Sequence, residues 1–206
     1  MTKFLKTVSA ALFSNKVDRL RLAFHAAVAP FHSELAELQT QHDAHAAKVQ
    51  AKQAVWEEFD EETGSGWSFG EDLAERREDA DDALLTIRKA FVMAVYHLWE
   101  RSAQRWGKSD DDHKGLVKAL AKAGIGVDSR LGELHLLVNC LKHNSKKAAP
   151  ELFANVPSLF APDFDPNALN TITGKPFSRI DWAENIVLTD ADVDRYLDVV
   201  LNSAPK

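Results

Sequence analysis

Apolar residues recur at three- and four-residue intervals along most of the chain, a pattern typical of amphipathic helices. The runs Phe4–Leu12 and Leu20–Val28 predict two helices, the first of which ends near Asn15. Pro30 lacks a backbone donor, so we expect the chain to kink or restart there. The whole pattern predicts an all-α helical bundle that carries a long antiparallel helical hairpin as an extension.

The most regular pattern follows Pro30 and alternates steps of four and three residues, as in the seam of a coiled coil. Its members are Phe31, Leu35, Leu38, His42, His45, Val49, Lys52, Trp56 and Phe59. Thr63–Gly66 then predicts a turn, because its two glycines permit left-handed torsions. A return helix of nearly the same period extends from Leu73 to Leu98. We therefore predict a long helical hairpin over residues 31–100 whose tip, at about 45–80, projects.

Signals for helix starts and stops divide the second half of the chain. Further helices are expected at Asp110–Ala123 and Arg130–Lys147, with an additional turn at 150–153 and a last helix from Thr189. Residues 156–188 are rich in proline and predict a long loop, with a short strand at Ile186–Leu188. We expect a single helical domain, 1–206, in which residues 101–155 and 189–203 form the body of the bundle.

Composition limits the class of protein. The chain has 206 residues and is 45% hydrophobic, which is enough for a sizeable core and excludes general disorder. A single cysteine excludes a disulfide scaffold and fits a reducing compartment. The longest apolar run, Ala90–Tyr96, is far shorter than the roughly 20 residues of a membrane helix. The N-terminal residues do not form a secretory signal, so we expect a cytoplasmic protein.

The formal net charge of −6 is unevenly distributed. Residues 34–82 hold fifteen acidic and four basic side chains, whereas residues 101–150 hold ten basic and five acidic ones. The basic segment includes one row at four-residue spacing, Lys114, Lys118 and Lys122. A globally acidic chain does not favour general binding to nucleic acid, but this segment leaves room for one anionic partner. Solvated helix faces are the alternative interpretation of both segments.

The segment Glu133–Ser145 combines residue types that suit chemistry on a phosphodiester. On a helix, one arc of about 100° would carry only polar side chains, and leucine and valine would occupy the other side. The polar residues are His135, Asn139, Lys142, His143 and Lys146. An imidazole can transfer a proton near neutral pH, and amide and ammonium groups can stabilise developing charge. An ordinary polar helix face is again the alternative.

The sequence Asn139-Cys-Leu-Lys-His143-Asn resembles the Asn-x-x-x-His core of the HEPN superfamily, which comprises small helical-bundle ribonucleases and their inactive relatives. Residues 149–160 and the closing helix resemble bacterial proteins with a similar signature, and Tyr96–Glu100 is similar to the helix on which the family places an acidic partner. The resemblance covers about residues 84–196. It implies a homodimer that cleaves RNA without a metal or other cofactor, in the manner of toxin–antitoxin and phage-defence proteins.

The resemblance also implies roles for individual residues. The catalytic residues would be His143, Asn139 and Lys142, supported by Glu100 and His135. The basic segment itself, apart from the resemblance, supplies the expected contacts to RNA or another anion: Lys114, Lys118, Lys122, Lys146 and Lys147. The family places an arginine four to six residues before the histidine, usually directly before the asparagine, and Val138 occupies that position here. A non-catalytic protein that binds RNA or a protein partner, or a structural homodimer formed through the helical hairpin, is therefore an equal alternative.

Other candidate sites rest on weaker patterns. A metal could be held by His42 and His45 with His25 or His32, although packing or partner contacts are commoner for such a set. His97 and Glu100 could transfer a proton or form a hydrogen bond within a helix. Cys140 faces away from the polar arc, so we expect it to be buried. The chain has no Walker loop, Gly-x-Gly-x-x-Gly or serine elbow, which disfavours nucleoside-triphosphate enzymes and serine hydrolases.

Overall fold

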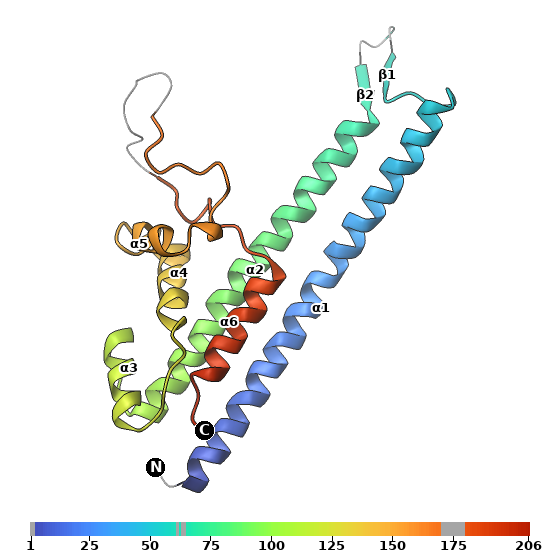
Figure 1. Cartoon of the computed structure of the whole chain (residues 1–206). Helices are drawn as coiled ribbons and strands as arrows, with labels where there is room; N and C mark the ends of the chain where they lie inside the picture. The colour runs from blue at the N-terminus through green and yellow to red at the C-terminus, as the bar shows by residue number, and fades with distance from the viewer. Residues whose placement is uncertain (1–2, 61, 63–64, 170–179) are drawn as a thin grey trace. The chain divides into compact units, whose positions relative to one another are not determined.

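The computed structural model describes residues 3–60, 62, 65–169 and 180–206. Its elements are α1 (Lys3–Gln50), β1 (Glu57–Asp60), β2 (Ser65–Ser68), α2 (Phe69–Gly107), α3 (His113–Lys122), α4 (Leu131–His143), α5 (Ala148–Asn155), the 3-10 helix η1 (Pro157–Leu159) and α6 (Asp190–Asn202) (Figure 1). The predicted all-α class is therefore confirmed, with one two-stranded antiparallel sheet added to it. Within the described residues, no helix is both long enough and apolar enough to cross a membrane.

The chain divides into two compact units. The first contains the described residues of Met1–Leu22 and Arg88–Lys206, and the second contains those of Ala23–Ile87. The helices α1 and α2 are long enough to contribute to both. The single domain predicted above stays a prediction, and each unit is described below by itself.

The first unit is organised around the aromatic side chains of the second half of α2. Trp99 is fully buried, and its indole N–H donates to the carbonyl of Ser203 at 3.4 Å. Trp106 meets Phe13 of α1 edge to face, with ring centroids 4.9 Å apart. The apolar sides of α3, α4 and α6 complete this core with Leu116, Leu120, Leu131, Leu134, Leu137, Val193, Leu197 and Val200. The core therefore holds α3 and α4 by their apolar sides and leaves their polar sides free.

The second unit consists of the second half of α1 and the first half of α2, which run antiparallel and are joined through the β1–β2 hairpin (Figure 1). Its buried apolar side chains are Phe24, Val28, Leu38, Leu73, Ala80 and Leu84. One side-chain hydrogen bond links the two arms, because Arg77 Nη1 donates to Gln39 Oε1 at 3.2 Å. Of the predicted seam over residues 31–49, Leu38 is buried, and it lines a cavity together with His42 and with Leu73 of α2.

The predicted helix end near Asn15 and a restart at Pro30 are wrong, because α1 is one helix from Lys3 to Gln50 with Pro30 inside it. An interior proline costs a helix about 3 kcal/mol, mainly through its missing N–H and a clash with the preceding turn. Pro30 is exposed, and Val28 and Leu38 are buried on either side of it. Tertiary packing on both sides of the proline therefore outweighs its local cost.

The predicted helix through Phe59 is also wrong, because α1 ends at Gln50. Lys52 adopts a left-handed φ of 57°, and the chain then enters β1. The segments Trp56–Asp60 and Ser65–Phe69 are rich in aromatic residues, which favour strands over a helix. Of the predicted turn, Thr63 and Gly64 lie outside the described residues, and Ser65 and Gly66 belong to β2.

The predicted helix over 130–147 is interrupted, because α4 ends at His143 and α5 begins at Ala148. Asn144 takes a left-handed φ of 45° between them, and its side chain binds backbone groups of the following loop. Its Nδ2 donates to the carbonyl of Ile180 at 3.0 Å, and its Oδ1 accepts from the N–H of Trp182 at 2.8 Å. Asn144 therefore anchors the long loop and stops α4.

The predicted loop over 156–188 contains η1, and the strand expected near its end is reduced to one bridge between Phe160 and Ile186. The start of the last helix is as predicted, because Thr189 and Asp192 form a reciprocal capping box. Two ion pairs hold this helix, α6, against other helices of its unit. Arg88 of α2 pairs with Asp190 at 2.7 Å, and Arg21 of α1 pairs with Asp194 at 3.0 Å.

Candidate functional site

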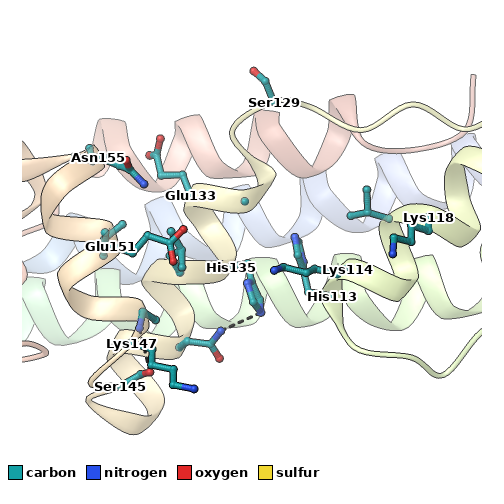
Figure 2. A pocket seen from close by; sticks show the side chains of 17 residues that line it. His113, Lys114, Lys118, Ser129, Glu133, His135, Ser145, Lys147, Glu151 and Asn155 are labelled. Atoms are coloured by element: carbon teal, nitrogen blue, oxygen red, sulfur yellow. Dashed lines mark hydrogen bonds between the residues drawn. The ribbon is translucent and has the colours of Figure 1, made fainter.

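A groove of about 960 Å³ lies between α3, α4 and α5 of the first unit. Figure 2 shows the side chains of all three helices directed into it, with His113 and His135 next to each other on one wall. Its polar lining consists of His113, Lys114, Lys118, Ser129, Glu133, His135, Asn139, Ser145, Lys147, Glu151 and Asn155. The groove thus collects imidazole, ammonium, amide and carboxylate groups in one place.

The start of α3 is built so that His113 and Lys114 enter the groove from its first turn. Asp112 caps the helix by accepting a hydrogen bond from the N–H of Gly115 at 2.9 Å. A side chain at Gly115 would bring its Cβ within 2.3 Å of the Asp111 Cβ, so this turn requires glycine. The sequence therefore fixes where α3 begins, and with it the position of His113.

The two groove histidines stack face to face. Their ring centroids are 4.1 Å apart and their planes differ by 9°. Nδ1 of His113 lies 3.1 Å from the hydroxyl of Tyr96, a buried side chain of α2. The amide Nδ2 of Asn139 donates to Nε2 of His135 at 2.9 Å, one helical turn along α4. Because that nitrogen accepts, the neutral His135 ring carries its proton on Nδ1 and has its lone pair on Nε2.

This environment favours uncharged side chains at the back of the groove. Burial lowers the pKa of His113 to about 4, and the neighbouring His135 lowers it further while Asp112 opposes the shift. Burial also lowers the pKa of His135, against the charges of Glu100 and Asp112, which raise it. Burial raises the pKa of Tyr96, so its hydroxyl stays protonated and can donate to His113. Both imidazoles are therefore neutral at pH 7.

The lining of the groove has an excess of free positive charge. Lys114, Lys118 and Lys147 are exposed ammonium groups around its opening. Of the two carboxylates, Glu133 is already engaged, because it accepts from the Tyr196 hydroxyl at 2.7 Å and from Arg195 at 3.3 Å. The lysines favour a ligand that carries negative charge. The neutral imidazoles favour one with a hydroxyl or other group that can give up a proton.

A second cavity, of about 830 Å³, lies between the end of α2 and α3. Its charged lining is also mainly basic, with Arg105, Lys108, Lys118 and Lys122 against Asp111. Lys118 lines both this cavity and the groove. The predicted lysine row on α3 therefore connects two basic depressions of the same unit.

The structure divides the catalytic set expected from the sequence. His135 and Asn139 line the groove and bind each other, whereas Lys142 and His143 are exposed at the end of α4 and are not part of its lining. Glu100 accepts from Nδ1 of His97 at 3.1 Å, so the expected pair exists as a hydrogen bond within α2. Asn139 was expected to act with the histidine four residues after it, and it binds the histidine four residues before it.

The expected anion contacts are divided in the same way. Lys114, Lys118 and Lys147 line the groove, Lys122 lines the second cavity, and Lys146 lines neither. Cys140 is fully buried, as expected, and burial raises the pKa of its thiol to about 11. The thiol is therefore protonated at neutral pH and is a poor nucleophile.

Sequence reasoning missed His113 and the role of Tyr96. His113 lies 22 residues before His135, and no local spacing joins two residues on different helices. One feature of the sequence could have pointed to His113. It directly follows the N-cap Asp112, and the first turn of a helix often binds anions. Tyr96 was placed on the right helix, but only its burial beside His113 reveals its contribution.

The histidines considered for a metal site have other contacts. Nε2 of His45 lies 2.9 Å from the carbonyl oxygen of Val55, and its ring stacks on Phe69 at 4.1 Å. His42 contacts Asp43 at 3.2 Å and lies against Trp56. Across the part of the chain that the structure describes, no group of three or more His, Cys, Asp or Glu side chains could hold a metal ion.

None of the family models, curated proteins or solved structures that were compared with this chain matches it.

Proposed function

We propose that this protein binds RNA in the α3–α4–α5 groove and cleaves its backbone there without a metal ion. The observation that carries the proposal is the neutral His135 in a groove lined by three lysines. Its Nε2 accepts from Asn139 in the free protein and would accept from a ligand hydroxyl once that amide turns toward the ligand. The resemblance of the Asn139–His143 segment to the HEPN superfamily supports the same class of substrate.

Binding would come mainly from the phosphates. The lysine row on α3 extends over eight residue steps, or about 12 Å of helix, and leads from the groove into the second basic cavity. Lysines that neutralise phosphates release condensed counterions, so such binding weakens steeply with salt. The row therefore supplies a path along which a single strand would continue past the groove.

Cleavage would use the 2′-hydroxyl of the RNA as the nucleophile. Nε2 of His135 takes the hydroxyl proton, the 2′ oxygen attacks the adjacent phosphorus, and the bond to the 5′ oxygen breaks as that oxygen takes a proton from solvent. The product is a 2′,3′-cyclic phosphate. Asn139, which holds Nε2 in the free protein, and the ammonium group of Lys114 would then stabilise the negative charge on the phosphate oxygens.

The reactive histidine in this proposal is His135, which precedes the Asn139–His143 motif. In the HEPN-like pattern His143 follows Asn139 by four residues, whereas here the partner of Asn139 precedes it by four residues. The rest of the resemblance is retained as part of the proposal: a cytoplasmic homodimer that acts in a toxin–antitoxin or phage-defence system. Binding of RNA without cleavage is the alternative, favoured by the valine at position 138.

The test is a cleavage assay on tRNA and total RNA in the presence of EDTA. His135→Ala should lower the rate by about 100-fold or more, the usual contribution of a general base. His143→Ala is the matched control, because it removes an exposed histidine of the same helix that lies outside the groove, and it should cleave like the wild type.

Three results would count against the proposal in different ways. Intact RNA with the wild-type protein, together with binding that the lysine variants weaken, would support the non-catalytic alternative. Loss of cleavage in His143→Ala with retention in His135→Ala would place the chemistry at the motif and not in the groove. Absence of both binding and cleavage would remove RNA as the ligand.

A further inference from the structure

The β1–β2 hairpin of the second unit exposes aromatic side chains at an acidic surface. Phe59 is 70% exposed and Trp67 is 50% exposed, and Val55 beside them is 54% exposed. Among the large hydrophobic side chains that are exposed in the described part of the chain, Phe59 and Trp67 are the only aromatic ones. Aromatic residues are enriched at protein–protein interfaces, so each exposed ring is a candidate for a contact.

The register of the sheet places a carboxylate beside each of these rings. Glu58 is paired with Trp67, so their side chains share one face of the hairpin. Phe59 is paired with Gly66 and shares the opposite face with Glu57, two residues before it in the same strand. The open position at Gly66 leaves room for the Phe59 ring, whose Cδ2 lies 3.5 Å from where a Cβ would stand.

Trp67 belongs to a cluster of aromatic rings that joins the hairpin to α1. Trp67 meets Phe69 with centroids 5.7 Å apart, and Phe69 stacks on His45 of α1 at 4.1 Å. Trp56 completes the cluster at 4.8 Å from His45. Because Phe69 packs against the Trp67 ring, a ligand would need to order this side chain less than one without a neighbour.

The charge around the hairpin is strongly negative. Residues 57–82 contain twelve acidic side chains and only two basic ones, Arg76 and Arg77. Such a field attracts cations and repels nucleic acid, anionic membranes and a second copy of the same acidic surface. Charge complementarity therefore selects one class of partner among those that an aromatic surface can bind.

We propose that the face formed by Trp67 and Glu58 binds a basic peptide segment, rich in arginine or lysine, of another protein. A guanidinium or ammonium group would lie over the Trp67 ring and pair with Glu58, while the remaining acidic residues attract the basic segment from a distance. The inference stands independently of the proposed function, because it uses neither the groove nor RNA.

The experiment measures binding of a fluorescein-labelled nona-arginine peptide to the full chain by anisotropy at 150 mM salt, where long-range attraction is screened. Trp67→Ala removes the ring without changing charge and should weaken binding by about five-fold or more. Glu58→Gln should weaken it by about two- to five-fold. Leu12→Ala, which removes another exposed hydrophobic side chain, and Glu184→Gln, which removes another exposed carboxylate, are the matched controls and should bind like the wild type.

Circular dichroism of each variant distinguishes a lost contact from a lost fold. Equal binding by folded Trp67→Ala and wild type would overturn the proposal, because only general charge attraction would then remain. Weakening by Glu184→Gln as large as that by Glu58→Gln would overturn it for the same reason. A wild-type dimer in sedimentation that Trp67→Ala dissociates would overturn it in favour of a second copy as the occupant.

Discussion

The groove and the hairpin are opposite in almost every property that governs binding. In the groove, polar side chains project from helices that a buried apolar core holds, and the free charge is positive. At the hairpin, aromatic side chains are exposed and the surrounding charge is negative. A net charge of −6 conceals this contrast, because it averages two surfaces that would select opposite ligands.

The two regions also differ in how their functional side chains are held. The groove histidines depend on long-range contacts, since Tyr96 of α2 reaches His113 of α3, which stacks on His135 of α4. The hairpin rings differ in exposure, because Trp67 and Phe59 remain at least half exposed, whereas Tyr96 is buried. We therefore expect mutations near the groove to change stability and function together, and mutations on the hairpin surface to change binding alone.

The largest expected effect on the free energy of unfolding is that of replacing Trp99, and the exposed Trp67 provides the comparison. Trp99 is completely buried in the core behind the groove, and Trp99→Ala should lower the free energy of unfolding by about 3–5 kcal/mol. Urea denaturation followed by circular dichroism measures this change. A loss below about 1 kcal/mol would mean that the core does not hold the groove as described.

A pH-dependent effect of about 1–2 kcal/mol is expected from His113, less than its full pKa shift implies because solvent partly screens the ring. Its pKa of about 4 in the folded protein lies below the ordinary value of 6.5, so the unfolded chain takes up the proton first as the pH falls. The stability contribution is therefore complete above pH 6.5 and is lost toward pH 4. Urea denaturation of the wild type and His113→Gln at pH 7 and 4.5 should show a smaller pH dependence in the variant; identical dependence would contradict the buried stacked pair.

A smaller effect is expected at the start of α3. Asp112→Ala removes the N-cap and should cost about 1 kcal/mol, with some loss of RNA affinity because His113 and Lys114 lie in the first turn. Asp110→Ala, two residues earlier and outside the helix, is the control. Equal thermal denaturation of both variants would show that the cap does not position this wall of the groove.

The smallest effect on stability is expected at the hairpin. Trp67→Ala should change the free energy of unfolding by less than about 0.5 kcal/mol, because half of the side chain is already in water. The same urea experiment as for Trp99→Ala makes the comparison direct. A cost as large as that of the buried tryptophan would show that Trp67 is structural and would blur the contrast between the two regions.

The sequence predicted what depends on local signals. Helical period, the helix starts near Asp110–Asp112 and at Thr189, and the burial of Cys140 all follow from residues near one another in the chain. It failed where distant contacts compete with a local rule, as at Pro30, which packing keeps inside α1. It also failed at the end of the heptad pattern, where Phe59 fits the helical spacing but pairs with Gly66 in the two-stranded sheet, a contact that local spacing does not show.

Only the part of the candidate site that lies on one helix could be predicted from local spacing. His135 and Asn139 share a helix face, so their spacing placed them together. The spacing could not show which of two histidines Asn139 binds, since both lie one turn away on the same face. Only the position of α3, set by the core, brings His113 against His135 and so distinguishes that end of the helix.

Hydrogen–deuterium exchange with and without a single-stranded oligouridine tests the central claim most directly, because it locates the RNA on the chain. The account predicts slower exchange at residues 113–122, 131–139 and 148–155, which form the groove, and unchanged exchange at residues 56–60 and 65–69 of the hairpin. Protection of the hairpin, or of none of the three groove segments at a saturating oligouridine concentration, would contradict it.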